Sequence, residues 1–279
     1  MTEGDWRRAE AYAYIDALAS ADLAWEFLRR NPDYRAFHAG LTGGPDPVDL
    51  TVGPAASHGW GLVFAADPGQ SALEQTVIWR PEWDPRVVIL GPVAAGDSAV
   101  LPPSSRWPVV TDLLLSSLGW HGDVILQGVR HRLFAPATPG RAAPLWTEPS
   151  VPRLPPDALA RGRAAATLAL IEALGPDPGG PPGRSPPDRP VRGGGPGTDG
   201  RRVRAPRRHR LALSVRALDA RADGASYRDL ARGLFGADRI AEAAWKTESL
   251  RDQTIRLVRT GRALSRGGFQ TLLGAPADI

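Results

Sequence analysis

Arginine residues recur along one side of residues 249–266. In a helix with 100° per residue, Leu250, Leu257 and Leu264 lie within about 40° of one another and form an apolar face. The opposite arc carries only one acidic residue, Asp252, and five arginines, which are Arg251, Arg256, Arg259, Arg262 and Arg266. One side of this segment is therefore expected to pack, and the other to present guanidinium groups to solvent.

Guanidinium groups form paired hydrogen bonds with phosphates and with the O6/N7 edge of guanine, where a good pair contributes about 1–3 kcal/mol of discrimination. The alternative is an ordinary solvated face, but such faces usually mix glutamate with the basic residues in i,i+4 pairs. Gly261 leaves open whether the helix continues or ends there, with the last two arginines in a separate turn. We expect double-stranded DNA as the partner. The expected contacts are Arg228, Lys246, Arg251, Arg256, Arg259, Arg262 and Arg266.

Two shorter helices are expected before this segment. The first ends near Gly224, and its apolar face is formed by Leu211, Val215, Leu218 and Ala222. Ser226 and Asp229 have the spacing of a capping box at the start of the second helix, which Gly236 ends. The connection to the third helix is longer than the usual three or four residues. The pattern predicts an all-α, helix-turn-helix-like domain with an extended turn.

Charge is divided unequally along the chain, which has 33 arginines and a single lysine. Arginine dominance is typical of a GC-rich genome, so the distribution is more informative than the number. Residues 1–175 carry a net charge of −5, and residues 176–279 carry +9. A basic region attracts polyanions, and counterion release favours nucleic-acid binding. The alternative is that arginines simply keep this surface solvated.

Glycine and proline make up 17 of the 31 residues in the segment 176–206. Such a segment buries too little apolar surface to offset the entropy lost on ordering, so we predict a flexible linker. It divides an acidic N-terminal domain, residues 1–175, from a basic DNA-binding domain, residues 207–275. Arginines in and beside the linker are expected to add loose phosphate contacts; they are Arg201, Arg202, Arg204, Arg207 and Arg208.

The N-terminal domain is predicted to mix helices and strands, so that the whole chain is of the α+β class. Residues 5–30 have the pattern of two helices, the second capped by Ser20 and ended by Asn31-Pro32. Short apolar runs at 60–67, 76–85 and 87–90 predict strands, and 123–136 predicts two strands around Gly128. One helix is expected at 109–119, and another from Ala158 to Leu174 with Gly175 as its stop.

Several other kinds of protein are excluded. The chain has no cysteine, no signal-peptide pattern and no apolar run long enough to span a bilayer, so a cytoplasmic protein without a membrane partner is expected. The five histidines lack metal-binding spacing, and His121 and Asp123 fit a turn before a strand better than a metal site. No catalytic constellation is present. We predict no enzymatic activity, no cofactor and no metal.

Three segments of the sequence resemble a known family. LDARADGASYRDLARGLFG, AAWKTESLRDQTIRLVRTG and ALSRGGFQTLL resemble the extended-turn helix-turn-helix domain of proteobacterial mobile-element regulators, formerly a domain of unknown function. DWRRAEAYAYIDALASADLAWEFLRRNPDYRAF resembles its usual partner, a transcriptional-regulator-like domain. WGLVFAADP and VIWRPEWDPRVVIL resemble the family's middle segment.

The resemblance implies a role. Two-domain members activate excision and conjugative transfer of integrative elements, whereas acidic single-domain members are antiactivators that bind the activator's N-terminal domain. Because this chain has both domains and a basic C-terminal one, it is expected to be an activator. The expected protein partners are RNA polymerase or an antiactivator, with the two domains contacting each other within or between chains. The alternative is an antiactivator or adaptor that binds proteins without touching DNA.

Overall fold

The computed structural model describes residues 5–42, 59–97, 100–108, 110–175, 205–236 and 249–274. The chain forms two compact units, each assembled from separate stretches of sequence. The helical unit comprises Met1–Val48, Ala66–Val77 and Arg201–Leu272, and the sheet unit comprises Asp49–Ala65, Ile78–Gly200 and Leu273–Ile279. No helix within these described ranges is long and apolar enough to cross a membrane.

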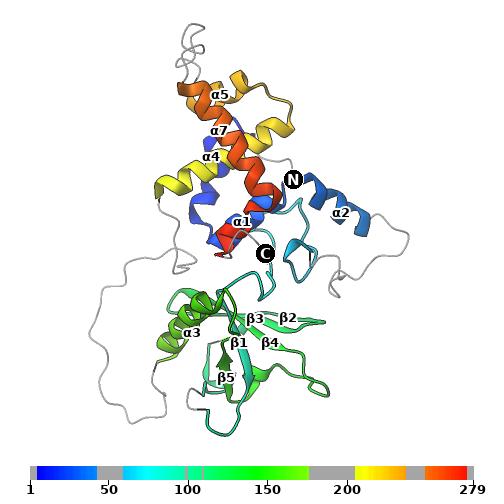
Figure 1. The fold of residues 1–279 in the computed structure, drawn as a ribbon, viewed down its shortest axis with the longest axis vertical. Coiled ribbons are helices and arrows are strands. Elements are labelled where there is room, and N and C mark those ends of the chain that lie inside the picture. Colours follow the sequence, from blue (N-terminus) through cyan, green and yellow to red (C-terminus); the bar gives the residue numbers. More distant parts are fainter. Residues whose placement is uncertain are drawn as a thin grey trace, which may run out of the picture. The chain divides into compact units, whose positions relative to one another are not determined.

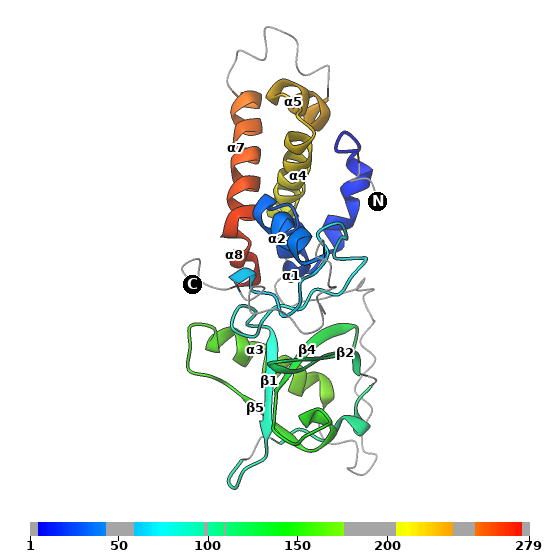
Figure 2. The same cartoon turned by 90° about the vertical axis from the view of Figure 1, so that its right-hand side faces the viewer.

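The helical unit brings N-terminal and C-terminal parts of the chain together. Its N-terminal elements are the 3-10 helix η1 (Ala9–Ala17) and the helices α1 (Ser20–Leu28) and α2 (Pro32–Thr42). The C-terminal elements are α4 (Ala205–Ala222), α5 (Tyr227–Phe235), α7 (Ser249–Ala263) and a π-helical turn (Leu264–Gly268), followed by α8 (Gln270–Leu273). In Figures 1 and 2 the blue N-terminal helices η1 and α1 lie against the yellow to red C-terminal helices.

Local signals correctly predicted most helix ends in this unit. The capping box at Ser226 and Asp229 is formed in both directions, and Gly236 ends α5 with a φ of +94°. The second helix stops before Asn31, whose side chain accepts a hydrogen bond from the Asp33 N–H (2.8 Å) at the start of α2. The expectation that Ser20 caps α1 is wrong by one position. Ala19 is the N-cap and forms no side-chain bond.

The sheet unit contains a mixed five-stranded sheet of order β2-β3-β4-β1-β5 within the described residues. Its strands are β1 (Val87–Pro92), β2 (Val110–Ser116), β3 (Gly119–Leu126), β4 (Val129–Pro136) and β5 (Ser150–Arg153). β1 pairs in parallel with β4, and the other neighbours are antiparallel. Helix α3 (Ala160–Leu174), green in Figure 1, packs against β1 and β3, and its Leu170 belongs to the buried core.

Two predictions for this unit are confirmed. β3 and β4 form the expected hairpin around Gly128, where Gln127 and Gly128 adopt positive φ angles of 51° and 76°. Such angles match the twist of a tight hairpin turn. Gly175 ends α3 with a φ of 72°.

Other predictions for the sheet unit are wrong. Residues 109–119 were expected to be helical, but Val110–Ser116 is strand β2, because tertiary pairing with β3 outweighs the local pattern. The runs 60–67 and 76–85 form only an isolated bridge between Leu62 and Trp79. His121 and Asp123 lie within β3 rather than in a turn before it.

The α+β fold therefore has N-terminal helices, a central mixed sheet and C-terminal helices. The N-terminal helices group with the C-terminal helices rather than with the sheet. Residues 176–204 lie outside the described residues, so the linker and the division of the chain at 176–206 stay predictions.

Candidate nucleic-acid interface

The arginine face expected on α7 is present. Thr254, Leu257 and Gly261 are buried, and Leu250 and Leu264 are half-buried. Among the described residues no carboxylate forms an ion pair with any of the five arginines, all of which are exposed: Arg251, Arg256, Arg259, Arg262 and Arg266. These guanidinium groups are therefore open to a polyanion.

Gly261 does not end the helix. α7 continues to Ala263, so Arg262 lies on the helix, whereas Arg266 lies in the π-helical turn that follows. A Cβ at position 261 would lie 2.8 Å from the Ser214 carbonyl oxygen and 2.9 Å from Leu218 Cγ, both on α4. Glycine is therefore required for the close approach of α7 to α4, a role that the sequence pattern alone did not indicate.

Arg228 and Lys246 are the other two residues predicted to contact DNA. Arg228 lies near the start of α5 and is half-buried. Lys246 lies outside the described residues. α5 packs against both α4 and α7, so the three C-terminal helices form one bundle. A DNA contact by any of these side chains stays a prediction.

Three charged residues of α4 are buried, although charged helix residues are usually exposed. Arg208 is 8% exposed, Arg216 is 6% and Asp219 is 3%. On a helical wheel they lie within about 80° of one another, beside the face that packs on α7. Their hydrogen-bond partners come largely from the N-terminal segment, residues 5–42.

Arg208 reaches the end of η1. Its Nη1 donates to the carbonyl oxygens of Ile15 (3.1 Å), Asp16 (2.9 Å) and Leu18 (2.5 Å). Guanidinium groups suit such a site because they carry several donors, and carbonyls at the end of a helix lack partners within it. The expected loose phosphate contact of Arg208 is therefore wrong, because the side chain is buried against protein.

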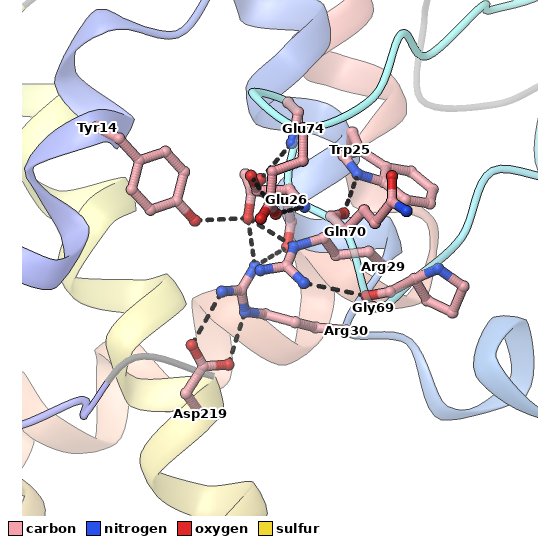
Figure 3. Close-up of polar contacts among 12 residues, drawn as sticks. Tyr14, Trp25, Glu26, Arg29, Arg30, Gly69, Gln70, Glu74 and Asp219 are labelled. Carbon is pink, nitrogen blue, oxygen red and sulfur yellow. Dashed lines mark hydrogen bonds and ion pairs between the residues drawn. The ribbon is translucent and has the colours of Figure 1, made fainter. Parts of the chain in front are cut away.

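Asp219 binds Arg30 of the segment that follows α1, as Figure 3 shows. The pair is bidentate, with Arg30 Nε donating to Asp219 Oδ1 at 2.6 Å and Nη2 donating to Oδ2 at 2.9 Å. The Tyr12 hydroxyl also donates to Asp219 Oδ2 at 2.7 Å. Arg30 Nη1 donates to Glu26 Oε2 at 2.7 Å, so one guanidinium joins two buried carboxylates.

Glu26 is the second anion of this network. Arg29 Nε and the Tyr14 hydroxyl each donate to its Oε2 at 2.8 Å (Figure 3), and the Ala72 N–H donates to Oε1 at 3.0 Å. Burial by itself raises the pKa of the Glu26 carboxyl, but Arg30 and Arg29 outweigh it and hold that pKa below its usual value. Glu26 is therefore ionised, and its charge is matched by nearby guanidinium groups.

Burial and neighbouring charges also set the pKa values of Arg30 and Tyr12. Burial acts to lower the pKa of Arg30, but Asp219 and Glu26 overcome it and raise that pKa well above its usual value. Burial, together with the neighbouring Asp219, raises the pKa of the Tyr12 hydroxyl far above its usual value. Tyr12 thus remains a neutral donor to Asp219.

Trp6 connects the N-terminal segment to α5. Its side chain is 1% exposed, and a Cβ on Gly233 of α5 would lie 2.4 Å from its ring. Arg216 of α4 donates to the carbonyl oxygens of Trp6 (3.0 Å), Arg7 (3.2 Å) and Gly233 (3.3 Å). One buried guanidinium thereby joins α4, α5 and the N-terminal segment.

Asn31 provides the contact with the end of α7. Its Nδ2 donates to the Ser265 carbonyl oxygen at 2.9 Å, in the π-helical turn. Arg30 binds α4 and Trp6 packs against α5, so the N-terminal segment contacts α4, α5 and the turn that follows α7.

Comparison with known proteins finds two family matches. Residues 5–65 match the proteobacterial transcriptional regulator-like domain, and residues 153–274 match the RovC-type DNA-binding domain described for T6SS transcription factors. No curated protein matches the chain. Both matched domains belong to transcription factors rather than to enzymes. The N-terminal match includes Trp6, Arg30 and Asn31, and the C-terminal match includes their partners.

Proposed function

We propose that this protein, a transcription factor with an N-terminal proteobacterial regulator-like domain and a C-terminal RovC-type DNA-binding domain, reads double-stranded DNA with the arginine face of α7. The observation that carries the proposal is the exposure of all five arginines on a helix whose opposite side is packed. Arg251, Arg256 and Arg259 would contact base edges, and Arg262 and Arg266 phosphates. Lys246 is also proposed to contact a phosphate, and Arg228 is proposed to assist.

Charge and geometry support this arrangement over a protein-only role. An antiactivator that acted as a DNA decoy would present acidic groups, whereas α7 presents guanidinium groups. Helix-turn-helix domains place one helix in the major groove, which is wide enough for an α-helix and displays the guanine edge. The alternative role, an antiactivator or adaptor without DNA contact, predicts no binding to any duplex.

The target genes are a finer part of the proposal. The matched DNA-binding domain is described for T6SS transcription factors, and the sequence resembles regulators of integrative and conjugative elements. We propose activation of one of these gene classes in the cytoplasm, with RNA polymerase or an antiactivator as protein partner. Genome-wide footprinting decides between footprints upstream of secretion genes and footprints upstream of excision or transfer genes.

The DNA contact is tested with a duplex selected by the wild-type protein from a random library. Arg256→Glu and Arg259→Glu are each expected to weaken binding at least tenfold, because each replaces a donor by a repelling carboxylate. Loss of a phosphate contact, as expected for Arg262→Ala or Arg266→Ala, should lower the slope of log affinity against log salt by about one. The measurement is a titration of the duplex at several salt concentrations.

A matched control is available on another helix. Arg106 is an exposed arginine of the 3-10 helix Ser104–Arg106 and lies outside both matched ranges, so Arg106→Glu makes the same change of charge outside the DNA-binding domain. We expect it to bind the duplex nearly as tightly as the wild type. Equal affinities for Arg256→Glu, Arg259→Glu and the control would contradict the proposed interface.

A further inference from the structure

Asp219 receives its hydrogen-bonded ion pair and its tyrosine bond from N-terminal residues, Arg30 and Tyr12. These partners are 189 and 207 residues away in sequence. Arg30 and Asp219 have side-chain exposures of only 4% each. Neither group can therefore bind DNA directly while this contact is formed.

We propose that the Arg30–Asp219 pair is a positioning element, which makes the N-terminal helices an integral part of the DNA-reading unit. This inference rests on the proposed function of α7. In this view residues 5–42 hold α4 in place, and α4 in turn sets the position of α7. Loss of the pair lowers DNA recognition although no DNA-contacting group is removed.

The geometry gives a path from the pair to the arginine face. Asp219 lies one residue after Leu218, and Leu218 lies against Gly261 of α7. Arg259 and Arg262 flank that glycine on the exposed side of the helix. Because the contact at Gly261 leaves no room for a Cβ, a shift of α4 must be followed by α7 or must open a gap between them.

Two further contacts also hold the C-terminal helices in position. Arg216 joins α4, α5 and the N-terminal segment through three carbonyl oxygens, and Asn31 binds the turn after α7. The N-terminal segment thus fixes the C-terminal helices relative to one another rather than simply covering one of them. Base reading needs this precision, because side chains must meet fixed positions on the base edges.

Specific and nonspecific DNA affinity should respond differently to loss of the Arg30–Asp219 pair. Nonspecific affinity depends on the number of guanidinium groups near phosphates, which a misplaced α7 still presents. Specific affinity depends on their geometry. The positioning role therefore predicts a fall in the ratio of specific to nonspecific affinity, with little change in the salt dependence of nonspecific binding.

The test uses the full chain with Asp219→Asn, which keeps the shape of the side chain but removes its charge. We expect affinity for the selected duplex to fall at least tenfold, and affinity for an unrelated duplex to fall less than threefold. Asp84→Asn is the matched control, because it neutralises a buried carboxylate paired with arginines in the sheet unit. It should retain both affinities.

A milder variant guards against loss of the fold. Tyr12→Phe removes one hydrogen bond to Asp219 and leaves the ion pair, so a two- to fivefold loss of specific affinity is expected. If circular dichroism shows Asp219→Asn to be unfolded at the assay temperature, Tyr12→Phe decides the question. Wild-type specificity ratios in the folded variants would overturn the positioning role. If the wild-type chain itself selects no duplex, the proposed DNA function fails instead.

Discussion

The helical unit and the sheet unit differ in what they bury and in what they expose. The helical unit buries a long-range ionic network and exposes arginines on α7. In the sheet unit the buried carboxylate of Asp84 pairs with Arg86, two residues away, and with Arg132. Most of the exposed large apolar side chains among the described residues belong to the sheet unit, namely Val93, Val100, Leu113, Leu115, Ile125, Leu154 and Leu168; Leu73 belongs to the helical unit.

This difference separates two kinds of surface within one transcription factor. Exposed guanidinium groups suit a polyanion. Exposed apolar side chains on an edge strand suit association with another chain. The buried charges differ as well. In the helical unit they join distant parts of the chain, so their loss should affect recognition; in the sheet unit they support only the unit itself.

The largest expected effect comes from removing a buried carboxylate in each unit. Asp219→Ala leaves the buried Arg30 without its bidentate partner, and Asp84→Ala removes the buried carboxylate that Arg86 and Arg132 share. Each should lower the free energy of unfolding of its own unit by about 3–5 kcal/mol. Chemical denaturation followed by unit-specific amide signals in NMR spectra measures both losses.

The two variants should differ in their affinity for DNA. Asp84→Ala should leave the affinity for the selected duplex intact at a temperature where the sheet unit remains folded, whereas Asp219→Ala should not. An equal loss of DNA affinity in the two variants would show that the units are not functionally distinct.

The next effect is a dependence of the unfolding free energy of the sheet unit on pH. Burial lowers the pKa of His121 to about 4, whereas an unfolded histidine titrates near its usual 6.5. Between these two pH values the unfolded chain binds a proton at His121, whereas the buried ring in the folded chain remains neutral. The unfolding free energy of the sheet unit should therefore fall by about 3 kcal/mol as the pH is lowered from 6.5 to 4.

His121→Gln isolates this contribution. The Ser116 hydroxyl donates to the Gly119 carbonyl (3.1 Å) and lies 3.0 Å from His121 Nε2, so a neutral ring that donates to the hydroxyl fits the site. Glutamine can also donate there but does not titrate. Unfolding curves at several pH values should be flatter for the variant than for the wild type between pH 6.5 and 4. Parallel curves would contradict the burial of a neutral ring.

A smaller effect is expected where α7 meets α4. Gly261→Ala places a methyl group against the Ser214 carbonyl oxygen and Leu218, and such overpacking typically costs about 1–3 kcal/mol. Gly40→Ala on α2 is the matched control, because a Cβ there meets no atom within 4 Å. The control should gain up to about 1 kcal/mol from helix propensity. Thermal unfolding compares the two, and a stabilised Gly261→Ala would contradict the close packing.

Local signals in the sequence predicted those elements whose causes lie within a few residues. The capping box at Ser226, the hairpin at Gly128 and the stop at Gly175 each depend on short-range backbone geometry. The exposed face of α7 followed from helical periodicity in the same way.

Contact between the N-terminal and C-terminal domains was expected from the family resemblance, but the residues that make long-range contacts were not predicted. β2 is a strand because β3 pairs with it, and the local sequence also fits a helix. Arg208, Arg216 and Asp219 have the pattern of a solvated helix face, and nothing near them in sequence indicates partners about 190–210 residues away. A charged cluster on α4 with few i,i+4 partners was the one signal that could have suggested a buried contact.

The smallest expected effect concerns the apolar surface of the sheet unit. Leu113 and Leu115 are 47% and 53% exposed on β2, which lies at an edge of the sheet. Leu113→Ser and Leu115→Ser together should change the unfolding free energy by less than about 1 kcal/mol, because exposed side chains bury little area. DNA affinity should be unchanged, since α7 belongs to the helical unit.

An exposed apolar edge strand nonetheless tends to associate with other chains. The double variant is therefore expected to remain soluble at higher concentration, which light scattering of both proteins at matched concentrations measures. Loss of DNA affinity in this variant would mean that β2 contributes to recognition. It would contradict the view that the arginine surface binds DNA and the apolar surface binds protein. Unchanged affinity with reduced self-association would show that the two surfaces act independently.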